Sequence, residues 1–516
     1  MIKIKKVMYN SKILTHKKNI SFGIDFGTTY SLIATALSEK IIIISDKEDR
    51  DLLPSIVNYN HSKPIVGWNA QEKNVCDPVN TISSVKRLIG LSLKEIKKLY
   101  PYLKYNFKED EKKTVSFIVN NSIVNIIDVS SQILYELKNR AISLFQKDIH
   151  GVVITVPAHF NDIQRQSIKK SAQLINLNVL RLLNEPTAAA IAYGLHLKNK
   201  GITVVYDLGG GTFDVSILNL NKKIFEVLST SGSTFLGGDD IDYLLLNYIK
   251  NKFLSLNIYN LSEQQELLNL VKLIKIQLSF KNFIAVTFKS IKIKVTHIEI
   301  HNIIKPIILK TLNICKLALK SANLSVKDVD NIVLVGGSTY IPIIRKYVME
   351  YFKKFPLFSI DPDKVVVIGA AIQANMLSKK NKKNNILLLD VVPLSLGIEV
   401  MGGIVETIIF KNTKIPISQK REFTTFKDGQ KSILIHILQG EEKTVKKCKS
   451  LSKFILSNIP IKPAGQTIII VKFQIDVNGI LSVTAKIKAT NIKKNISINS
   501  IYECCELQSF NMKENK

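Results

Sequence analysis

The chain is poor in the residues that crosslink secreted proteins and in the runs that span membranes. Its 516 residues include five cysteines, Cys76, Cys315, Cys448, Cys504 and Cys505, which form no CxxC motif and no paired framework. This usage favours reduced thiols in a cytosol. The apolar runs are far too short to cross a bilayer. The first twenty residues carry lysines but no apolar core or cleavage site typical of a secretory signal. They also lack arginine, which argues against a mitochondrial presequence. We therefore expect a cytoplasmic protein without a membrane partner.

The formal net charge of +30 raises the question of a nucleic-acid partner. The lysines are scattered rather than gathered on one expected helix or loop, and Lys, Ile and Asn are all abundant, as in proteins of AT-rich genomes. Composition therefore argues against nucleic-acid binding. The length predicts two to four domains, each with its own core.

The most informative segment is Asp207-Leu-Gly-Gly-Gly-Thr-Phe-Asp214, which follows the apolar run 202–206. Glycines let a turn after a strand direct its amides toward a ligand. Asp207 and Asp214 are the carboxylates that a hydrated Mg²⁺ prefers. By itself, a strand that ends in glycines is equally typical of a hairpin or a bulge.

The segment 21–29 repeats this design with a strand, Asp25, Gly27, Thr28 and Thr29. Two such turns indicate a duplicated phosphate-binding element that grips a nucleotide from two sides. The triplet that begins at Asp25 also spells the metal-binding motif of protein kinases. Too few residues precede it for the other kinase motifs, so the kinase interpretation fails.

Four weaker motifs follow in order along the chain. Taken alone, Lys86 in 86–90 is typical of a solvated lysine. The others are the strand 151–156 before Pro157, with Asn161 or Asp162 as a helix cap; Glu185 directly before Pro186 at a helix start; and Gly336, Gly337 and Ser338 after a third apolar strand.

Together these motifs resemble the DnaK-type heat-shock chaperones, over about residues 22–502. Within that family, the segments 421–430, 435–441 and 479–485 are most similar to the branch specialised in iron–sulfur cluster assembly, and a basic N-terminal extension also suits that branch. The resemblance implies an α/β, actin-like, duplicated ATPase domain followed by an all-β sandwich that binds substrate. The expected parts are a basic extension (1–20), the nucleotide-binding domain (21–380), an interdomain linker (381–392), the sandwich (393–502) and a short tail (503–516).

The family carries a long helical lid after the sandwich, whereas only a short tail follows Tyr502 here. Either the lid was lost or the chain is truncated, and both alternatives predict fast peptide exchange. Periodicity supports the other parts. Apolar residues at 267, 270, 271, 274 and 278 predict a helix over 263–278. The segment 379–385 contains no apolar residue and predicts a solvated connector.

Period-two patterns dominate after Pro393. Alternation at 473, 475 and 477, and again at 481, 483 and 485, surrounds Asn478-Gly479 and predicts a β-hairpin. The segment 423–429, followed by Ile433, Ile435 and Ile437, repeats the pattern and predicts a second hairpin. A sandwich is the expected architecture.

The resemblance also implies roles for individual residues and cofactors, ATP and Mg²⁺. Asp25 and Asp207 would hold Mg²⁺ through water, and Lys86, Glu185, Thr212 and Asp214 would form the catalytic group. The expected ATP-binding residues are Gly27, Thr28, Thr29, Gly209, Gly210, Gly211, Gly336, Gly337, Ser338, Lys275, Ser279 and Tyr340. The adenosine pocket departs from the family, because Lys272 and Ile276 stand where Glu and Arg are common and Tyr340 replaces a flanking Arg. We expect weaker adenosine contacts and fast nucleotide exchange.

The apolar run Leu387, Leu388, Leu389 precedes Asp390 in the expected linker. An ordinary edge strand is the alternative. Burying a leucine stabilises by about 1.5–3 kcal/mol, and ordering each residue costs about 1–2 kcal/mol. Because these terms nearly cancel, ATP could switch the docking of this segment. By resemblance, a J-domain co-chaperone would engage Arg181 and Asp390.

The expected peptide groove comprises Ile398, Met401, Phe423, Phe426, Ile433 and Ile435, with Met401 and Phe426 arched over an extended peptide. Without the resemblance, these residues would be assigned to the sandwich core. The expected client is the iron–sulfur scaffold protein, bound by a Leu or Pro anchor and a nearby Lys, which would need Glu399 and Glu422 to face it.

We expect a monomeric, ATP-dependent, peptide-binding chaperone. A general protein-folding chaperone is an alternative within the same class. A sugar-kinase-like phosphotransferase is an alternative of another class, since a fold does not fix a function. A third reading is an ATPase without a lid that acts only as a scaffold.

Overall fold

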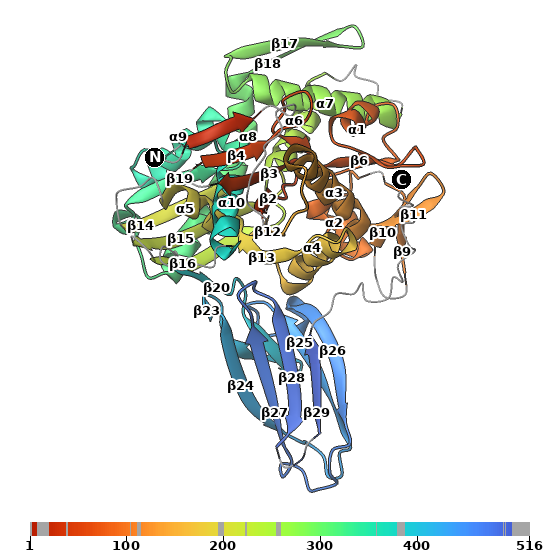
Figure 1. Ribbon diagram of the computed structural model, residues 1–516, viewed down its shortest axis with the longest axis vertical. Coiled ribbons are helices and arrows are strands. Elements are labelled where there is room, and N and C mark those ends of the chain that lie inside the picture. Colours follow the sequence, from red (N-terminus) through yellow and green to blue (C-terminus); the bar gives the residue numbers. More distant parts are fainter. Residues whose placement is uncertain are drawn as a thin grey trace.

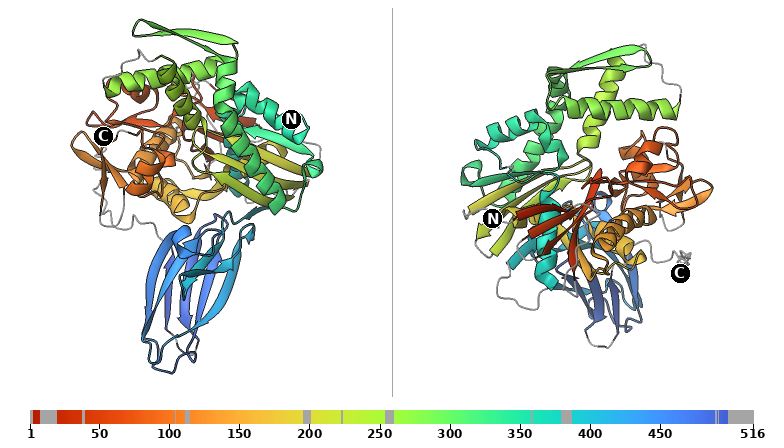
Figure 2. Two further views of the ribbon diagram at one scale, coloured as in Figure 1. Left: turned by 180° about the vertical axis from the view of Figure 1, so that it is seen from behind. Right: turned by 45° about the horizontal axis from the view of Figure 1, so that its top comes forward.

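A computed structural model (Figure 1) describes residues 3–7, 20–37, 40–103, 105–110, 115–194, 201–221, 224–253, 260–357, 359–378, 387–488, 490 and 492–497. It has an α/β body with a separate group of strands packed beneath it (Figures 1 and 2). The expected connector 379–385 and tail 503–516 lie outside the described residues. The cysteines that are described, Cys76, Cys315 and Cys448, are free thiols.

The body contains two large mixed sheets that share a strand order. In each, three antiparallel strands are followed by a parallel strand inserted from later in the chain. The first sheet runs β1-β4-β3-β2-β12-β13, with β5 beside β3, and the second runs β19-β14-β15-β16-β20-β23. Their strands are β1 (Lys3–Val7), β2 (Ser21–Asp25), β3 (Tyr30–Leu37), β4 (Lys40–Ile44), β5 (Leu53–Pro54), β12 (Gly151–Val156), β13 (Val179–Asn184), β14 (Gly201–Leu208), β15 (Phe213–Asn221), β16 (Ile224–Ser233), β19 (Asn331–Val335), β20 (Leu387–Val391) and β23 (Lys414–Ile415).

Two helices, α5 (Glu185–Gly194) and α10 (Val365–Ser378), join the two sheets into one core. Both are rich in apolar residues on all sides, as helices buried between layers must be. Small residues set how closely they pack. A Cβ at Gly23 of β2 would lie 2.1 Å from the backbone nitrogen of Ala371. The predicted helix start at Glu185 is confirmed.

The outer layers of the body consist of helices and small sheets. The helix predicted over 263–278 is confirmed as α7, which buries Leu267, Val271 and Ile274. The other elements are β6 (Ile56–Asn58), β7 (Ile65–Val66), α1 (Trp68–Lys73), β8 (Thr81–Ser83), η1 (Val85–Arg87), α2 (Leu93–Leu99), β9 (Phe107–Glu109), β10 (Val115–Val119), β11 (Ser122–Asn125), α3 (Ile126–Phe145), α4 (Asp162–Leu174), α6 (Gly238–Lys252), α7 (Leu261–Gln277), β17 (Phe283–Phe288), β18 (Ile291–Thr296), α8 (His297–Ser321), η2 (Val326–Asp328), η3 (Gly337–Tyr340) and α9 (Pro342–Phe352).

The C-terminal strands form two four-stranded sheets around their own core, β22-β21-β25-β26 and β24-β27-β28-β29. The hairpin at Asn478-Gly479 is confirmed, with Gly479 at a φ of +74°. The first strand ends at Ile475, so Val477 lies exposed in the turn. The strands are β21 (Leu396–Val400), β22 (Ile404–Ile409), β24 (Ile417–Thr424), β25 (Ser432–Gln439), β26 (Lys449–Ser457), β27 (Ile468–Ile475), β28 (Leu481–Ile487) and β29 (Lys493–Ser497), with the short turn η4 (Val445–Lys447).

The second predicted hairpin, over 423–437, is wrong. Strand β24 pairs with β27, whereas β25 pairs with β21 and β26 in the opposite sheet. The loop at Asp428-Gly429 therefore crosses from one sheet to the other. Both strands bury apolar side chains in the same core, so they face each other across it rather than pairing along their edges.

The described part of the expected linker, 387–391, forms β20. It lies parallel to β16 on one side and pairs with β23 on the other. This strand therefore connects the body to the sandwich as well as extending the second sheet. No helix among the described residues is long and apolar enough to cross a membrane.

Candidate nucleotide site and its connection to the sandwich

A cavity of about 830 Å³ lies between the two halves of the body. The three glycine turns predicted from the sequence meet around it. Of the predicted residues, Asp25, Gly27, Thr28, Thr29, Lys86, Glu185, Asp207, Gly209, Gly210, Thr212, Lys275, Ser279, Gly336, Gly337, Ser338 and Tyr340 line it. Gly211 and Asp214 lie behind this lining. The repeated design of the first two turns predicted that they face a common site, and the structure adds the third turn to it.

The turns that follow β2, β14 and β19 touch one another at the cavity wall. A Cβ on Gly210 would lie 2.1 Å from the hydroxyl oxygen of Thr29, so only glycine permits this approach. Ser338 of the third turn donates a hydrogen bond to the carbonyl of Gly209 (2.9 Å). The turns therefore form one polar cradle rather than three separate loops.

Lys86 forms a buried ion pair with Glu185. Its Nζ lies 2.5 Å from Glu185 Oε1 and 2.5 Å from the carbonyl oxygen of Phe26. The two residues are only 3% and 7% exposed. The alternative of a solvated lysine is therefore wrong. Because Lys86 comes from η1 and Glu185 from the start of α5, the pair fixes two distant segments at the cavity wall.

Three aspartates crowd around this ion pair. Burial, followed by repulsion from Glu185, raises the pKa of Asp25 to about 7 and that of Asp214 to about 7. The same causes raise the pKa of Asp207 well above its usual value. One lysine faces four carboxyl groups, so the site lacks positive charge.

A divalent cation fits this deficit. In the described part of the chain, no group of three or more His, Cys, Asp or Glu residues is arranged to hold a metal ion directly. Carboxylates such as those of Asp25 and Asp207 are groups that suit a hydrated ion such as Mg²⁺, which keeps several of its waters.

The far end of the cavity is more apolar than the sequence indicated. Lys275 is paired with Asp242 (2.7 Å), so it ties α7 to α6. Tyr340 donates to Asp361 (2.5 Å). Leu273 and Ile276 of α7 and Phe280, just after its end, are exposed and line the cavity. Their three- and four-residue spacing is the sequence signal for this apolar surface.

A second ion pair spans the cleft. Arg87, next to Lys86, contacts Asp239 (3.4 Å) and Asp240 (2.9 Å) at the start of α6. Burial opposes the charge on Arg87, but the two aspartates outweigh it and hold its pKa above the usual value. The rings of Tyr102 and Tyr243 stack nearby with centroids 3.4 Å apart. The sequence gave no indication of these ion pairs, because Arg87 and the two aspartates are far apart in the chain.

Asp390, at the end of the leucine run, points into the body. Asn184 donates to its Oδ2 (2.8 Å) and so does Thr187 (3.2 Å). Burial raises the pKa of Asp390. Arg181 is half-buried on the neighbouring strand β13, where burial lowers its pKa and Asp390 opposes that change. Asn184 directly precedes Glu185, so the linker and the ion pair share a short segment.

Arg165 connects the sandwich to that segment. Its guanidinium donates to Asn184 Oδ1 (2.7 Å) and to the carbonyl of Asn478 at the tip of the sandwich hairpin (3.4 Å). Asn478 in turn accepts from the backbone nitrogen of Leu182 (3.0 Å). The path therefore runs from the hairpin through Arg165 and Asn184 to Glu185. The sequence contained no signal for Arg165.

Asp162 makes the adjacent interdomain contact. Asn161 caps α4 in a capping box, which settles the choice between these two residues. Asp162 is thereby free to accept from the backbone nitrogen of Leu481 in the sandwich (2.7 Å). Burial raises the pKa of Asp162 to about 7.

The expected groove residues divide into two groups. Ile435 is only 2% exposed and lies with Ile398 in the sandwich core, against which Phe423 and Ile433 pack half-buried. Met401 and Phe426 are 79% and 60% exposed. Ile398 and Ile435 are therefore core residues of the sandwich rather than accessible groove residues, while Met401 and Phe426 are accessible to a ligand.

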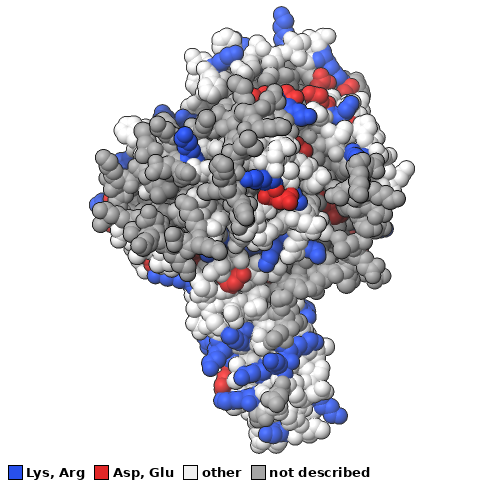
Figure 3. All heavy atoms as spheres, viewed as in Figure 1, with Lys and Arg blue, Asp and Glu red and all other residues white. Residues whose placement is uncertain are grey.

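The acidic groups near the expected groove are already paired. Glu399 bonds to His436 (2.6 Å), and Glu422 to Lys488 (3.0 Å). The visible face of the sandwich carries many Lys and Arg side chains and few acidic ones (Figure 3). A lysine in a bound peptide would therefore meet little free negative charge there.

Comparison with known proteins agrees with this combination of site and sandwich. A family model described as Hsp70 protein matches residues 21–515. The chain belongs to the Hsp70 family. Its relatives include the chaperone protein HscA of Buchnera aphidicola subsp. Baizongia pistaciae, at 57% identity over 97% of this chain and 98% of that protein. Proteins of the same name from Buchnera aphidicola subsp. Schizaphis graminum and Yersinia enterocolitica are 51% and 46% identical over 94% and 96% of this chain and 80% and 81% of their own.

Membership in the Hsp70 family supports an Hsp70-type chaperone role, and proteins of this family in general bind and hydrolyse nucleotide. Its mixed sheets and strand-rich C-terminal part agree with an ATPase body and a β-sandwich.

Proposed function

We propose that the protein is an ATP-dependent chaperone in which nucleotide in the body controls how the sandwich holds an extended peptide. The observation that carries the proposal is the path from the hairpin tip through Arg165 and Asn184 to Glu185. The shared strand order of the two sheets supports a duplicated, actin-like body for ATP.

The residues divide the chemistry of hydrolysis among them. The amides of Gly209 and Gly210, with Thr28 and Thr29, bind the phosphates. Asp25 and Asp207 would hold Mg²⁺ through water, and the ion would supply positive charge beside the phosphates.

The ion pair then acts on the attacking water. Lys86 and Glu185 position it and stabilise charge at the γ-phosphate, with Thr212 beside them. Asp214 keeps its place behind the cradle, where its Oδ1 accepts from the backbone nitrogen of His159 (3.0 Å). Positioning and electrostatics are the main demands of phosphoryl transfer.

Coupling runs through the linker as well as the hairpin. Leu387, Leu388 and Leu389 pair with β16 while Asp390 bonds to Asn184, so movement of Glu185 alters both contacts. We infer that a J-domain co-chaperone binds near Arg181 and Asp390 and that its binding depends on the arrangement of these contacts.

The client is an extended segment of the iron–sulfur scaffold protein, by analogy with the HscA relatives. Met401 and Phe426 would flank it, and backbone pairing would supply most of the affinity. Binding is weak and reversible, and the protein acts as a cytoplasmic monomer. The paired state of Glu399 and Glu422 makes the apolar anchor more important than the lysine.

The test is steady-state ATP turnover with a Leu-Pro-Pro-Val-Lys peptide and with a scrambled control. Stimulation by the first peptide alone supports the client assignment. Equal stimulation by both leaves a general folding chaperone. No stimulation by either, together with transfer of labelled phosphate to a small hydroxyl compound, would replace the chaperone by a phosphotransferase.

A further inference from the structure

The N-terminal strand β1 has no part in the function described above. It lies parallel to β4 at the edge of the first sheet, with five residue pairs from Lys3–Lys40 to Val7–Ile44. The sequence predicted only a basic extension here. The extension therefore contributes backbone structure to the nucleotide-binding body (Figure 1).

Strand β1 holds the same position in its sheet as the linker strand β20 holds in the other. β1 is parallel to β4, which begins the antiparallel series β4-β3-β2. β20 is parallel to β16, which begins the antiparallel series β16-β15-β14. Each half of the body thus has an added parallel strand beside the first strand of its antiparallel series, and in one half that strand belongs to the expected linker.

Without β1, the edge of β4 would be open to pairing with a strand of another chain. Strand β4 reads Lys-Ile-Ile-Ile-Ile, and all four isoleucines, 41–44, are buried. An apolar edge strand with free backbone groups invites pairing with another chain. Because parallel pairing satisfies those groups along the whole of β4, β1 completes the sheet.

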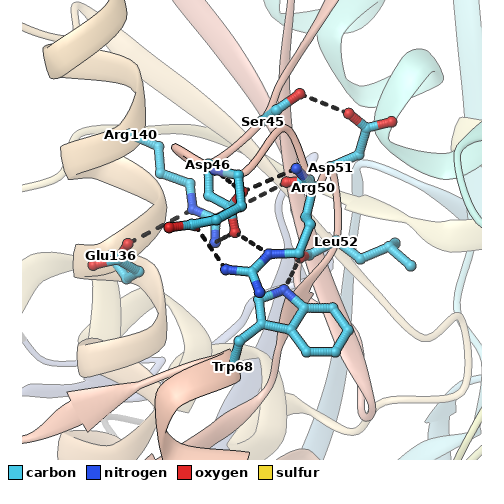
Figure 4. A network of polar contacts seen from close by, with 9 residues as sticks. Ser45, Asp46, Arg50, Asp51, Leu52, Trp68, Glu136 and Arg140 are labelled. Carbon is cyan, nitrogen blue, oxygen red and sulfur yellow. Dashed lines mark hydrogen bonds and ion pairs between the residues drawn. The ribbon is translucent and has the colours of Figure 1, made fainter. Parts of the chain in front are cut away.

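Strand β4 also leads directly to the wall of the nucleotide cavity. Asp46, two residues after β4, forms an ion pair with Arg50 (2.8 Å), whose guanidinium lies over the ring of Trp68 (5.0 Å). Trp68 donates to the carbonyl of Leu52 (3.1 Å). Figure 4 shows these side chains turned toward one another. Trp68 and Leu52 both line the cavity.

We propose that the edge of β4 is a strand-addition site, filled by the chain's own residues 3–7, and that its occupancy slows the release of nucleotide. The second half of this proposal rests on the nucleotide binding proposed above. With β1 in place, β4 and the network after it hold Trp68 and Leu52 against the cavity. Without β1, the end of β4 loosens and that wall opens more often.

A matched pair of variants tests the proposal on the full chain. Lys5→Pro/Lys6→Pro removes two charges and two backbone donors, whereas Lys5→Ala/Lys6→Ala removes only the charges. The measurements are hydrogen exchange at the amides of residues 40–44 and the release rate of a fluorescent ADP. For the proline variant we expect exchange at least about tenfold faster and release at least about threefold faster. The alanine variant should match the parent in both.

A peptide of residues 1–9, added to the proline variant of the full chain, should restore slow exchange and slow release, and a scrambled peptide should not. Unchanged exchange in the proline variant would overturn the strand assignment. Faster exchange with unchanged ADP release would overturn the control of release. If the parent formed dimers that separate when the peptide is added, the strand on β4 would come from a second copy of the chain. That result would overturn the proposal that each chain fills its own edge.

These outcomes are distinct from failure of the proposed function. If the parent bound no ADP, the nucleotide-binding proposal would fail along with the control of release. Exchange at residues 40–44 would still report on whether β1 fills the edge.

Discussion

The buried pair of Lys86 and Glu185 should respond unequally to loss of its two members. Removing one partner of a buried ion pair normally costs about 3–5 kcal/mol, because the other charge is left unpaired. Here carboxyl groups outnumber the single lysine around the pair, since Asp25, Asp207 and Asp214 lie close to it as well. We therefore expect Lys86→Ala to lower the free energy of unfolding by about 3–5 kcal/mol. Glu185→Ala should cost no more than about 1–2 kcal/mol, because it also removes the repulsion between Glu185 and the three aspartates.

The assay is urea unfolding of the nucleotide-free chain, followed by the fluorescence of Trp68. This residue is the only tryptophan and lines the cavity. At pH 5 the difference between the two variants should narrow, because the carboxyls of Asp25 and Asp214, with pKa values of about 7, are then protonated. A loss for Glu185→Ala equal to or greater than that for Lys86→Ala, at neutral pH, would refute this account of the charges.

Arg87→Ala should break the ion pairs with Asp239 and Asp240 of α6 and raise the ADP release rate at least about fivefold, by analogy with other buried charge pairs. An unchanged rate in stopped-flow release measurements would show that these ion pairs do not control opening of the cleft. Docking of the sandwich should weaken as pH rises toward 8, because Asp162 has a pKa of about 7 when docked and a lower one when solvated, so the docked state binds more protons. Asp162→Asn should flatten that profile in a fluorescence-transfer measurement between body and sandwich, and a parent profile without pH dependence would contradict it. Gly479→Ala should undock the sandwich more than Gly465→Ala in the same measurement. Both positions have positive φ, but only at Gly479 would the added Cβ meet the guanidinium of Arg165, at 3.3 Å. Equal docking in the two variants would show that this contact does not matter.

Local motifs carried most of what the sequence could predict. Gly27, Gly210 and Gly336 could be identified because a turn that approaches phosphate demands glycine after a strand. The hairpin at Asn478-Gly479 was equally local. Its role was not, since nothing in the pattern indicated that Asn478 reaches Arg165 in another domain.

The failures came from pairing over long distances. The segment 423–437 has the alternation of a hairpin, but both of its strands needed the same core, which places them in opposite sheets. Ile398 and Ile435 share the period of groove residues, yet burial assigns them to packing. Alternation specifies which face of a strand is apolar, and it does not specify which strand lies alongside.

In the proposed mechanism, the nucleotide in the body changes how stably the sandwich is docked on the body. Its most direct test is hydrogen exchange at the amide of Leu481, which donates to Asp162 across the junction. The rate should be measured with ATP in the Lys86→Ala variant, in which loss of the lysine proposed to position the attacking water should slow hydrolysis. It should also be measured with ADP in the parent and in the variant. The account predicts rates that differ at least about tenfold between the ATP and ADP states. The same rate in both states would contradict it.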